Sequence, residues 1–180
     1  MRVTSGSYRS RLLSSLRGAA SRPTLDKVKQ AVFNHLAEMQ DRVFLDLFAG
    51  SGAIGIEALS RGAAKTVFND KLPEAIEVIK VNLTKLKVPE SVFAIYNLDY
   101  AVLLTQLNEK FDYIYLDPPF GSTDLDDCLK LIASRHLLQS KGTIIVESAI
   151  MTNISTENWE IYKQAKYGSI KISYLQNPTK

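Results

Sequence analysis

The segment Asp117-Pro118-Pro119-Phe120 combines residue types that could hold an amino group beside a planar ring. Two consecutive prolines fix the backbone and remove two N–H donors, which leaves the Asp117 carboxylate beside an exposed carbonyl oxygen. This pair of acceptors suits an exocyclic –NH₂ group, and Phe120 offers a face on which a base can stack. Alternatively, the segment is only a turn that leaves a strand, with Phe120 packed on the surface.

A glycine-rich stretch earlier in the chain could place a ligand. Val43–Gly55 reads VFLDLFAGSGAIG, which predicts a buried strand with Asp46 near its end, followed by a tight turn and a helix. Such a turn directs free backbone N–H groups towards a ligand and lets the backbone approach it closely. Gly50, Gly52 and Gly55 match the dinucleotide pattern G-x-G-x-x-G. This match alone does not identify the ligand.

Carboxylates recur where the predicted strands end. In an open parallel sheet these ends line one edge, where ligands bind. Any one acid could simply cap a helix or a turn, but five at one edge would repel one another without a cation or a function. Their number and the nearby glycine turn favour a functional site for the Asp117 segment. The acids are Asp46, Asp70, Asp99, Asp117 and Glu147.

Two of these acids point to an adenosine-containing cofactor. Asp70 lies 20 residues after Gly50, where a carboxylate can accept hydrogen bonds from ribose hydroxyls. Asp99 could accept from an adenine amino group, or could cap a helix that begins at Tyr100. NAD and S-adenosylmethionine both fit this spacing. Hydride transfer from NAD needs no acceptor pair like that at Asp117, so we favour S-adenosylmethionine.

The pattern of strands and helices predicts a mostly parallel α/β sheet with an antiparallel edge hairpin. Strands alternate with helices as far as residue 147, and two strands then follow each other directly. The predicted strands are Val43–Leu47, Thr66–Asp70, Ser91–Leu98, Phe111–Leu116, Gly142–Glu147, Trp159–Ala165 and Ser169–Leu175. The predicted helices are Thr24–Met39, the segment from Gly52 to Arg61, the segment from Pro73 to Lys87, Tyr100–Leu107 and Asp124–Leu138.

Composition indicates one globular domain, residues 1–180, with a basic arm (1–23) and a cofactor-binding core (24–180). Cys128 is the only cysteine, and His35 and His136 are far apart in sequence, so we expect no disulfide and no metal site. No apolar run reaches the roughly 20 residues that span a bilayer. We expect a cytoplasmic protein that does not bind membranes.

The positive charge is concentrated near the N-terminus. Residues 1–30 carry seven basic residues against one acid, whereas the remaining residues carry 15 basic and 18 acidic ones. A basic arm on an acidic body suggests a polyanionic partner. A solubilising tail or a targeting peptide would explain the composition too. Within the arm, Arg2–Leu13 has a hairpin-like layout around Ser5-Gly6-Ser7.

Taken together, these motifs make the chain resemble the bacterial small-subunit ribosomal RNA guanine-N2 methyltransferases. The resemblance covers nearly the whole length, and the combination of motifs is far more specific than the DPPF tetrapeptide alone. The residues that carry it are Met1-Arg2-Val3, Gly6, Tyr8-Arg9, Arg22-Pro23-Thr24, Asp46–Gly52, Glu57–Ala63 and Asp117–Phe120.

The resemblance implies a Rossmann-like class I methyltransferase fold with a seven-stranded sheet and helices on both faces. It implies transfer of a methyl group from S-adenosylmethionine to the 2-amino group of a guanine in 16S rRNA, free or in a partly assembled subunit. We expect a monomer. The family usually has Glu where this chain has Asp70. The implied catalytic residues are Asp117, Pro118, Pro119 and Phe120; the cofactor-binding residues are Asp46, Phe48, Ala49, Gly50, Ser51, Gly52, Asn69, Asp70 and Asp99; the RNA-binding residues are Arg9, Arg11, Arg22 and Thr24.

Other functions stay open at this point. The same chemistry could act on adenine or cytosine in DNA, or on a glutamine side chain of a protein. The chain could also be a non-catalytic RNA-binding module, although the intact glycine turn and DPPF segment argue against this. An NAD-dependent dehydrogenase is the weakest alternative, because no His or Tyr proton donor lies in a motif. Residues 150–166 match no motif, and the sequence does not identify the target nucleotide.

Overall fold

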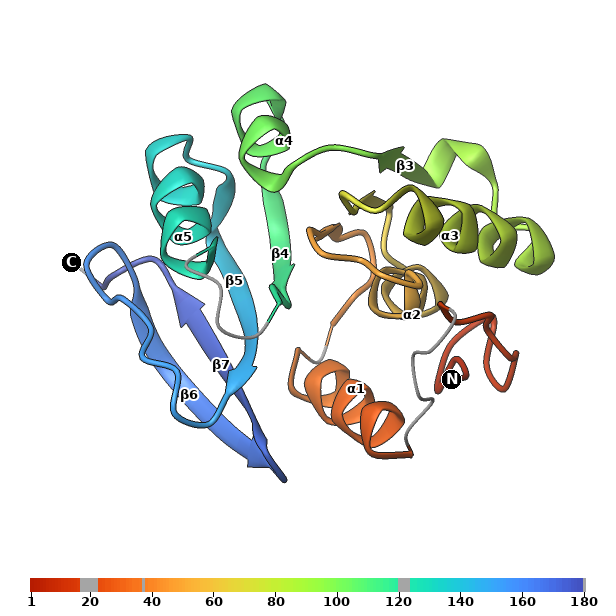
Figure 1. The fold of residues 1–180 in the computed structure, drawn as a ribbon, viewed down its shortest axis with the longest axis horizontal. Coiled ribbons are helices and arrows are strands. Elements are labelled where there is room, and N and C mark those ends of the chain that lie inside the picture. Colours follow the sequence, from red (N-terminus) through yellow and green to blue (C-terminus); the bar gives the residue numbers. More distant parts are fainter. Residues whose placement is uncertain (17–22, 37, 120–123, 180) are drawn as a thin grey trace.

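The computed structural model describes residues 1–16, 23–36, 38–119 and 124–179, and its centre is a seven-stranded sheet (Figure 1). The strands lie in the order β3-β2-β1-β4-β5-β7-β6. β1 to β5 pair in parallel, whereas β7 pairs antiparallel with both β5 and β6. The predicted parallel sheet with an antiparallel edge hairpin is therefore confirmed. The strands are β1 Val43–Asp46, β2 Lys65–Asn69, β3 Phe93–Tyr96, β4 Phe111–Leu116, β5 Leu138–Ala149, β6 Glu160–Tyr167 and β7 Ile170–Gln176.

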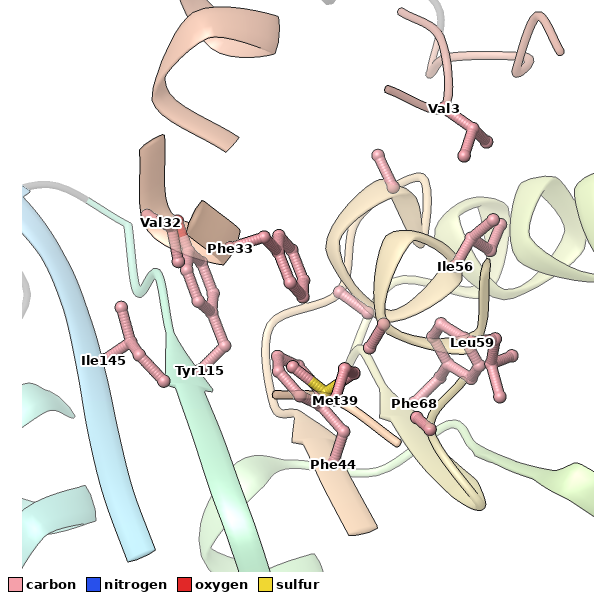
Figure 2. Close-up of a cluster of buried hydrophobic side chains, with 14 of the residues drawn as sticks. Val3, Val32, Phe33, Met39, Phe44, Ile56, Leu59, Phe68, Tyr115 and Ile145 are labelled. Atoms are coloured by element: carbon pink, nitrogen blue, oxygen red, sulfur yellow. The ribbon is translucent and has the colours of Figure 1, made fainter. Parts of the chain in front are cut away.

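Helices cover both faces of the sheet, as predicted. On one face, buried side chains of α1, α2 and α3 pack on the sheet, and Figure 2 shows part of this cluster. The other face is covered by α4 and α5. Successive strand residues face opposite sides: Phe44 and Phe68 belong to the first cluster, and Leu45 and Val67 to the second. The helices are α1 Pro23–Leu36, α2 Ala53–Ser60, α3 Pro73–Leu86, α4 Tyr100–Gln106 and α5 Asp124–Ser134, with a 3₁₀ turn, η1, at Glu90–Val92.

The order of the strands determines where a ligand can bind. From β1 the chain proceeds outward to β2 and β3, and then crosses back to β4 on the other side of β1. The connections after β1 and β4 therefore diverge, which opens a crevice at the carboxyl ends of these two strands. No helix in the described ranges is long and apolar enough to cross a membrane.

The predicted boundary between α5 and β5 is wrong. The helix ends at Ser134 rather than Leu138, and Leu138 already begins β5, four residues before the predicted start at Gly142. His136 adopts a left-handed conformation (φ 52°), and the Leu137 N–H bonds to the carbonyl of Ile132, as in a helix C-terminal motif. The apolar residues there continue the helical pattern because they are buried against the strands, so hydrophobic spacing alone could not separate the two elements.

Two other predicted elements are too long. The first helix ends at Leu36, although Met39 beyond it is buried in the same cluster. The third strand spans only Phe93–Tyr96, since Glu90–Val92 form η1 and β3 pairs with a single neighbour at the sheet edge. The remaining elements end within two residues of their predicted limits, which is the ordinary uncertainty of helix and strand ends.

The N-terminal arm folds back on itself and packs against α2 and α3 (Figure 1). An antiparallel bridge joins Arg2 to Leu12, which confirms the hairpin-like layout. Gly6 (φ 81°) lies so close to α2 that a Cβ there would be 1.7 Å from the Ser60 carbonyl oxygen. Only glycine permits this approach.

Glu57 of α2 is the main anchor of the arm. Its carboxylate is fully buried and accepts hydrogen bonds from the Thr4 N–H (2.8 Å), the Thr4 hydroxyl (2.7 Å) and the Ser5 N–H (3.0 Å). Arg61 (2.9 Å) and the buried Lys29 (3.4 Å) form ion pairs with it. Burial alone would raise the pKa of Glu57, but these hydrogen bonds and charges hold that pKa below its usual value.

We predict that Glu57→Ala lowers the free energy of unfolding by about 3–5 kcal/mol. The buried Lys29 would keep only the partly exposed Asp26 as a partner, at 3.6 Å, and the Thr4 and Ser5 N–H groups would lose their acceptor. Urea denaturation would measure this change. Because the pKa of Glu57 is lowered, its contribution should be present above its ordinary pKa of 4.5 and be lost as the pH falls below it. Glu38→Ala is the control, since that exposed residue pairs with Arg42 only at 3.8 Å. A loss in Glu57→Ala no larger than in the control would show that Glu57 does not anchor the arm.

Candidate active site

A cavity of about 260 Å³ lies at the carboxyl ends of β1, β4 and β5. The turn between β1 and α2 forms one wall, from Phe48 to Ser51 with Ala53 and Ile54 behind it. The strand ends form a second wall with Asp46, Tyr115, Asp117 and Glu147, and α1 and the arm form the third with Val28, Lys29, Met1, Ser15 and Leu16. The glycine turn and the DPPF segment, 65 residues apart between Gly52 and Asp117, therefore border the same space.

The glycine turn has the geometry that its sequence predicts. Gly50 (φ 53°) and Gly52 (φ 77°) both adopt left-handed conformations, and Gly52 immediately precedes α2. Gly55 lies against β2, where a Cβ would be 2.3 Å from the Phe68 ring. The first two glycines thus permit the turn, and the third permits close packing of helix and strand.

Asp46, at the end of β1, holds the glycine turn in place. Its buried carboxylate accepts a hydrogen bond from the Gly55 N–H at 2.8 Å, in the first turn of α2. Burial raises the pKa of Asp46 to about 7, although the Gly55 hydrogen bond opposes the rise. One N–H group at the start of α2 is therefore already paired with an acid of the protein itself. This pairing makes the helix start a poor cradle for the pyrophosphate of a dinucleotide.

Asp70 supports the same turn from β2. Its two oxygens accept hydrogen bonds from the Gly50 N–H and the Leu72 N–H, both at 2.9 Å. Each carboxylate oxygen has a second lone pair that a ribose hydroxyl could use. Asp70 does not line the cavity among the described residues, so its predicted contact with a cofactor stays a prediction.

Asn69 and Asp99 are not among the described residues that line the cavity. The buried Asn69 amide donates to the carbonyls of Leu47 (3.2 Å) and Leu98 (3.1 Å), which ties three strand ends together. Asp99 accepts a hydrogen bond from the Ala101 N–H (2.9 Å) and so caps α4. Of the two roles considered for Asp99, helix capping is the one present here. The adenine contact of Asp99 and the cofactor contact of Asn69 stay predictions.

The DPPF segment leaves β4 at the cavity. Asp117 presents an accessible side chain that borders the cavity, Pro118 is buried and Pro119 is exposed. Desolvation by the surrounding cavity wall, with the charges of Glu147 and Asp46, raises the pKa of Asp117 well above its usual value. The predicted stacking residue, Phe120, lies outside the described residues.

The cavity wall also contains Tyr115, Glu147 and Lys29, to which the sequence assigned no individual role. The Tyr115 hydroxyl donates to the Glu147 carboxylate at 2.5 Å, and both side chains are buried. Burial raises the pKa of Glu147, and the Tyr115 hydrogen bond opposes that rise. Lys29 also borders the cavity, but its ammonium donates to the Arg2 carbonyl (2.5 Å) and pairs with Glu57 (3.4 Å) and Asp26 (3.6 Å). The sequence identified Glu147 as a strand-end acid. For Tyr115 and Lys29 it predicted only a position in a strand and in a helix.

The arm and the glycine turn are joined by Asn82 of α3. Its buried amide donates to the carbonyls of Ser14 and Ser51, both at 3.0 Å, and accepts from the Ser14 N–H at 2.7 Å. Ser14 directly precedes the arm residues that line the cavity. The arm is therefore part of the cavity wall as well as a basic surface.

The predicted RNA-binding residues are only partly visible. Arg9 is exposed, and Arg11 is exposed with its guanidinium donating to the Lys85 carbonyl at 3.3 Å. Arg22 lies outside the described residues, and Thr24 lies in the first turn of α1 with its side chain undescribed. The described residues contain no cluster of His, Cys, Asp and Glu that could hold a metal ion.

Comparison with known proteins gives matches along nearly the whole chain. Residues 1–176 match the family Cons_hypoth95, "Conserved hypothetical protein 95". The chain is 40% identical over 151 residues to "Putative rRNA methyltransferase YlbH" of Bacillus subtilis, which covers 82% of both proteins. It is 33% identical to "Ribosomal RNA small subunit methyltransferase D" of Haemophilus influenzae, covering 98% of this chain and 94% of the relative. The solved structure "Putative methyltransferase yhhF from Escherichia coli" has 29% identity and a TM-score of 0.87 over 100% of this chain and 99% of that one.

These matches agree with the strand order and with the cavity between the glycine turn and the DPPF segment. The chain has the class I methyltransferase fold. It belongs to the Cons_hypoth95 family of methyltransferases, the family of the proteins named ribosomal RNA small subunit methyltransferase D.

Proposed function

We propose that the protein transfers a methyl group from S-adenosylmethionine to the 2-amino group of a guanine in 16S rRNA. The observation that carries this proposal is the position of Asp117 directly after β4, where it borders the same cavity as the glycine turn. Relatives named as small-subunit rRNA methyltransferases support the RNA substrate.

The charges around the cavity fit S-adenosylmethionine better than a dinucleotide. Asp46, Asp117 and Glu147 border the cavity, and Lys29, the one basic residue among its described lining residues, is paired with Glu57 and Asp26. The pKa values of all three acids are raised, so each would be stabilised by a cation nearby. A sulfonium supplies that positive charge and an activated methyl group, whereas a pyrophosphate would add negative charge.

The protein's part in the reaction is to orient the target amino group. Its lone pair is delocalised into the guanine ring, which makes the nitrogen a poor nucleophile. Hydrogen bonds from its two protons to the Asp117 carboxylate and the Pro118 carbonyl would make the nitrogen more tetrahedral and align it with the methyl group. Phe120 would hold the extruded base by stacking, which contributes about 1–3 kcal/mol. Proton loss after transfer can go to water, so Asp117 need not act as a strong base.

The basic arm would bind the RNA backbone. Arg9 and Arg11 are exposed on the arm, which is fixed to α2 and α3 beside the cavity. Phosphate contacts of this kind position the RNA without reading its sequence. Selection of the base would then fall to the cavity itself.

Asp117→Ala should lower methyl transfer by about 100-fold or more, because the amino group loses an acceptor that orients it. The gene would be deleted, and the cells would then be complemented with either the wild-type protein or the variant. Mass spectrometry would map the modified nucleosides in their 16S rRNA. We expect N2-methylguanosine at one position with the wild-type protein and its absence with the variant. Calorimetry should show an affinity for S-adenosylhomocysteine, which lacks the sulfonium charge, within about threefold of wild type, and Glu38→Ala is the matched surface control. Normal modification by Asp117→Ala would refute the catalytic role, and loss of a different nucleoside would refute the proposed substrate.

Cofactor binding should release protons near neutral pH. With a pKa of about 7, Asp46 is largely protonated at pH 6.5, and a bound cation favours its ionised form. We therefore expect release of up to about 0.7 proton from this residue at pH 6.5, and an affinity that rises as the pH goes from 6 to 8. Titration calorimetry in buffers of different ionisation enthalpy measures the release. Asp46→Asn should release fewer protons than wild type; an equal release in both would show that Asp46 does not respond to the cofactor.

Neutralising Arg9, Arg11 and Arg22 together should weaken RNA binding and flatten its salt dependence. Each lost phosphate contact reduces the slope of log K against log salt by about 0.7–0.9, so the triple variant should lose about 2. Filter binding over a range of salt concentrations would measure it. Neutralising Lys110, Lys130 and Lys141, which lie on the β4–α5–β5 side, removes the same charge elsewhere and should change the slope less. Equal slopes in the arm variant and wild type would mean that the arm does not bind the phosphates.

A further inference from the structure

Glu147 lies beside Asp117 in the cavity, and the mechanism above gives it no role. β4 and β5 are parallel and pair Leu116 with Val146, so Asp117, which directly follows β4, comes next to Glu147 of β5. Both border the cavity. Two residues before Asp117, Tyr115 of β4 pairs with Ile145 of β5, and Figure 2 shows Tyr115 beside Ile145, under Val32 of α1.

The Glu147 carboxylate is held in place but not saturated. The Tyr115 hydroxyl donates to its Oε2 atom at 2.5 Å, which fixes the orientation of the group. Within the described residues Glu147 has no other hydrogen-bond donor, so Oε1 can accept from a ligand. A buried carboxylate with a single donor is stabilised by a second one. The nearby cation, Lys29, is already engaged by Arg2 and Glu57.

The cavity therefore offers two adjacent acceptors, the Asp117 carboxylate and the Glu147 carboxylate, and Pro118 follows Asp117 directly in the chain. Guanine presents a matching row of donors, since its ring N1–H lies directly beside its 2-amino group. In adenine and cytosine, the ring nitrogen beside the amino group is an acceptor instead. A carboxylate facing that nitrogen would attract guanine and repel the other two bases.

We propose that Glu147 accepts a hydrogen bond from the N1–H of the target guanine and thereby selects guanine over the other amino-bearing bases. This inference rests on the proposed methyl transfer to guanine. Tyr115 acts as the positioning residue that holds the Glu147 carboxylate. Asp117 and Pro118 then orient the amino group, and Glu147 identifies the base to which it belongs.

The test compares guanine with 2-aminopurine, which keeps the 2-amino group but has an acceptor at N1. A synthetic RNA segment that carries either base at the mapped position is ligated into 16S rRNA. The enzyme is given this rRNA both free and in reconstituted small subunits. The ratio of kcat/KM for the two substrates is measured on wild type, Glu147→Gln and Tyr115→Phe. Differences in intrinsic reactivity of the two amino groups cancel when the ratios of the proteins are compared.

Wild type should prefer guanine by at least about 100-fold, because an unmatched buried polar group strongly disfavours the analogue. Glu147→Gln can donate to the N1 acceptor, so the preference should fall by at least about tenfold. Tyr115→Phe keeps the carboxylate but removes the hydrogen bond that orients it, so the preference should fall, and by less than in Glu147→Gln. The dissociation constant of S-adenosylhomocysteine should be similar in wild type and Glu147→Gln.

Other outcomes separate the possible errors. If Glu147→Gln slows both substrates equally, the residue is only structural and the inference fails. If it weakens S-adenosylhomocysteine binding while the base preference is unchanged, the acid serves the cofactor and the inference fails. If wild type methylates guanine and 2-aminopurine equally, the inference fails while the proposed function stands. If wild type modifies a base other than guanine, the proposed function itself is wrong.

Discussion

The hydrogen bond from the Gly55 N–H to Asp46 is the contact on which the site depends. It joins the end of β1 to the first turn of α2 at 2.8 Å, so the intervening chain must turn sharply, and Gly50 and Gly52 supply the left-handed conformations that this turn needs. The bond also occupies an N–H at the start of the helix with an acid of the protein. In dinucleotide-binding proteins the same glycine pattern binds pyrophosphate. Here the glycine turn forms an uncharged backbone wall beside an acidic cavity.

The arm depends on this arrangement as well, because the residues that hold it come from α2 and α3. Glu57 lies on the helix that Asp46 positions, and it satisfies the backbone N–H groups of Thr4 and Ser5. Asn82 then connects Ser14 of the arm to Ser51 of the glycine turn. Because the arm and the turn share the buried Asn82 amide, a displacement of the turn would also displace the arm, and a displacement of the arm would displace the turn. In the proposed function, this makes the phosphate-binding surface and the cofactor wall parts of one rigid unit.

Sequence analysis could predict the fold because its signals are local. Strand and helix periodicity, the three glycines and the hairpin at the C-terminal end each depend on neighbouring residues, and the strand-end acids were placed at one edge by topology alone. Contacts that join distant segments have no such local signal. Glu57 and Asn82 look like ordinary helix residues, and their partners in the arm lie more than 50 residues away. Leu138 fits a helical pattern and becomes strand only because Phe111 pairs with it. Asp70 and Asp99 occupy the predicted strand ends, but their hydrogen bonds go to backbone N–H groups, which spacing alone could not distinguish from ligand contacts.

The distribution of charge links the two halves of the proposed function. Three acids surround the cavity, whereas exposed arginines lie on the arm beside it. Phosphate groups are repelled from an acidic cavity and attracted to the basic arm, so RNA would be held at the rim with its backbone outside. A neutral base that presents only N–H donors can enter, and each donor relieves the burial of a carboxylate. Poor solvation makes the ionised forms of these acids unfavourable. This cost is fully offset only when a cation and a base edge with N–H donors are both bound, which favours binding of the two substrates together over either one alone.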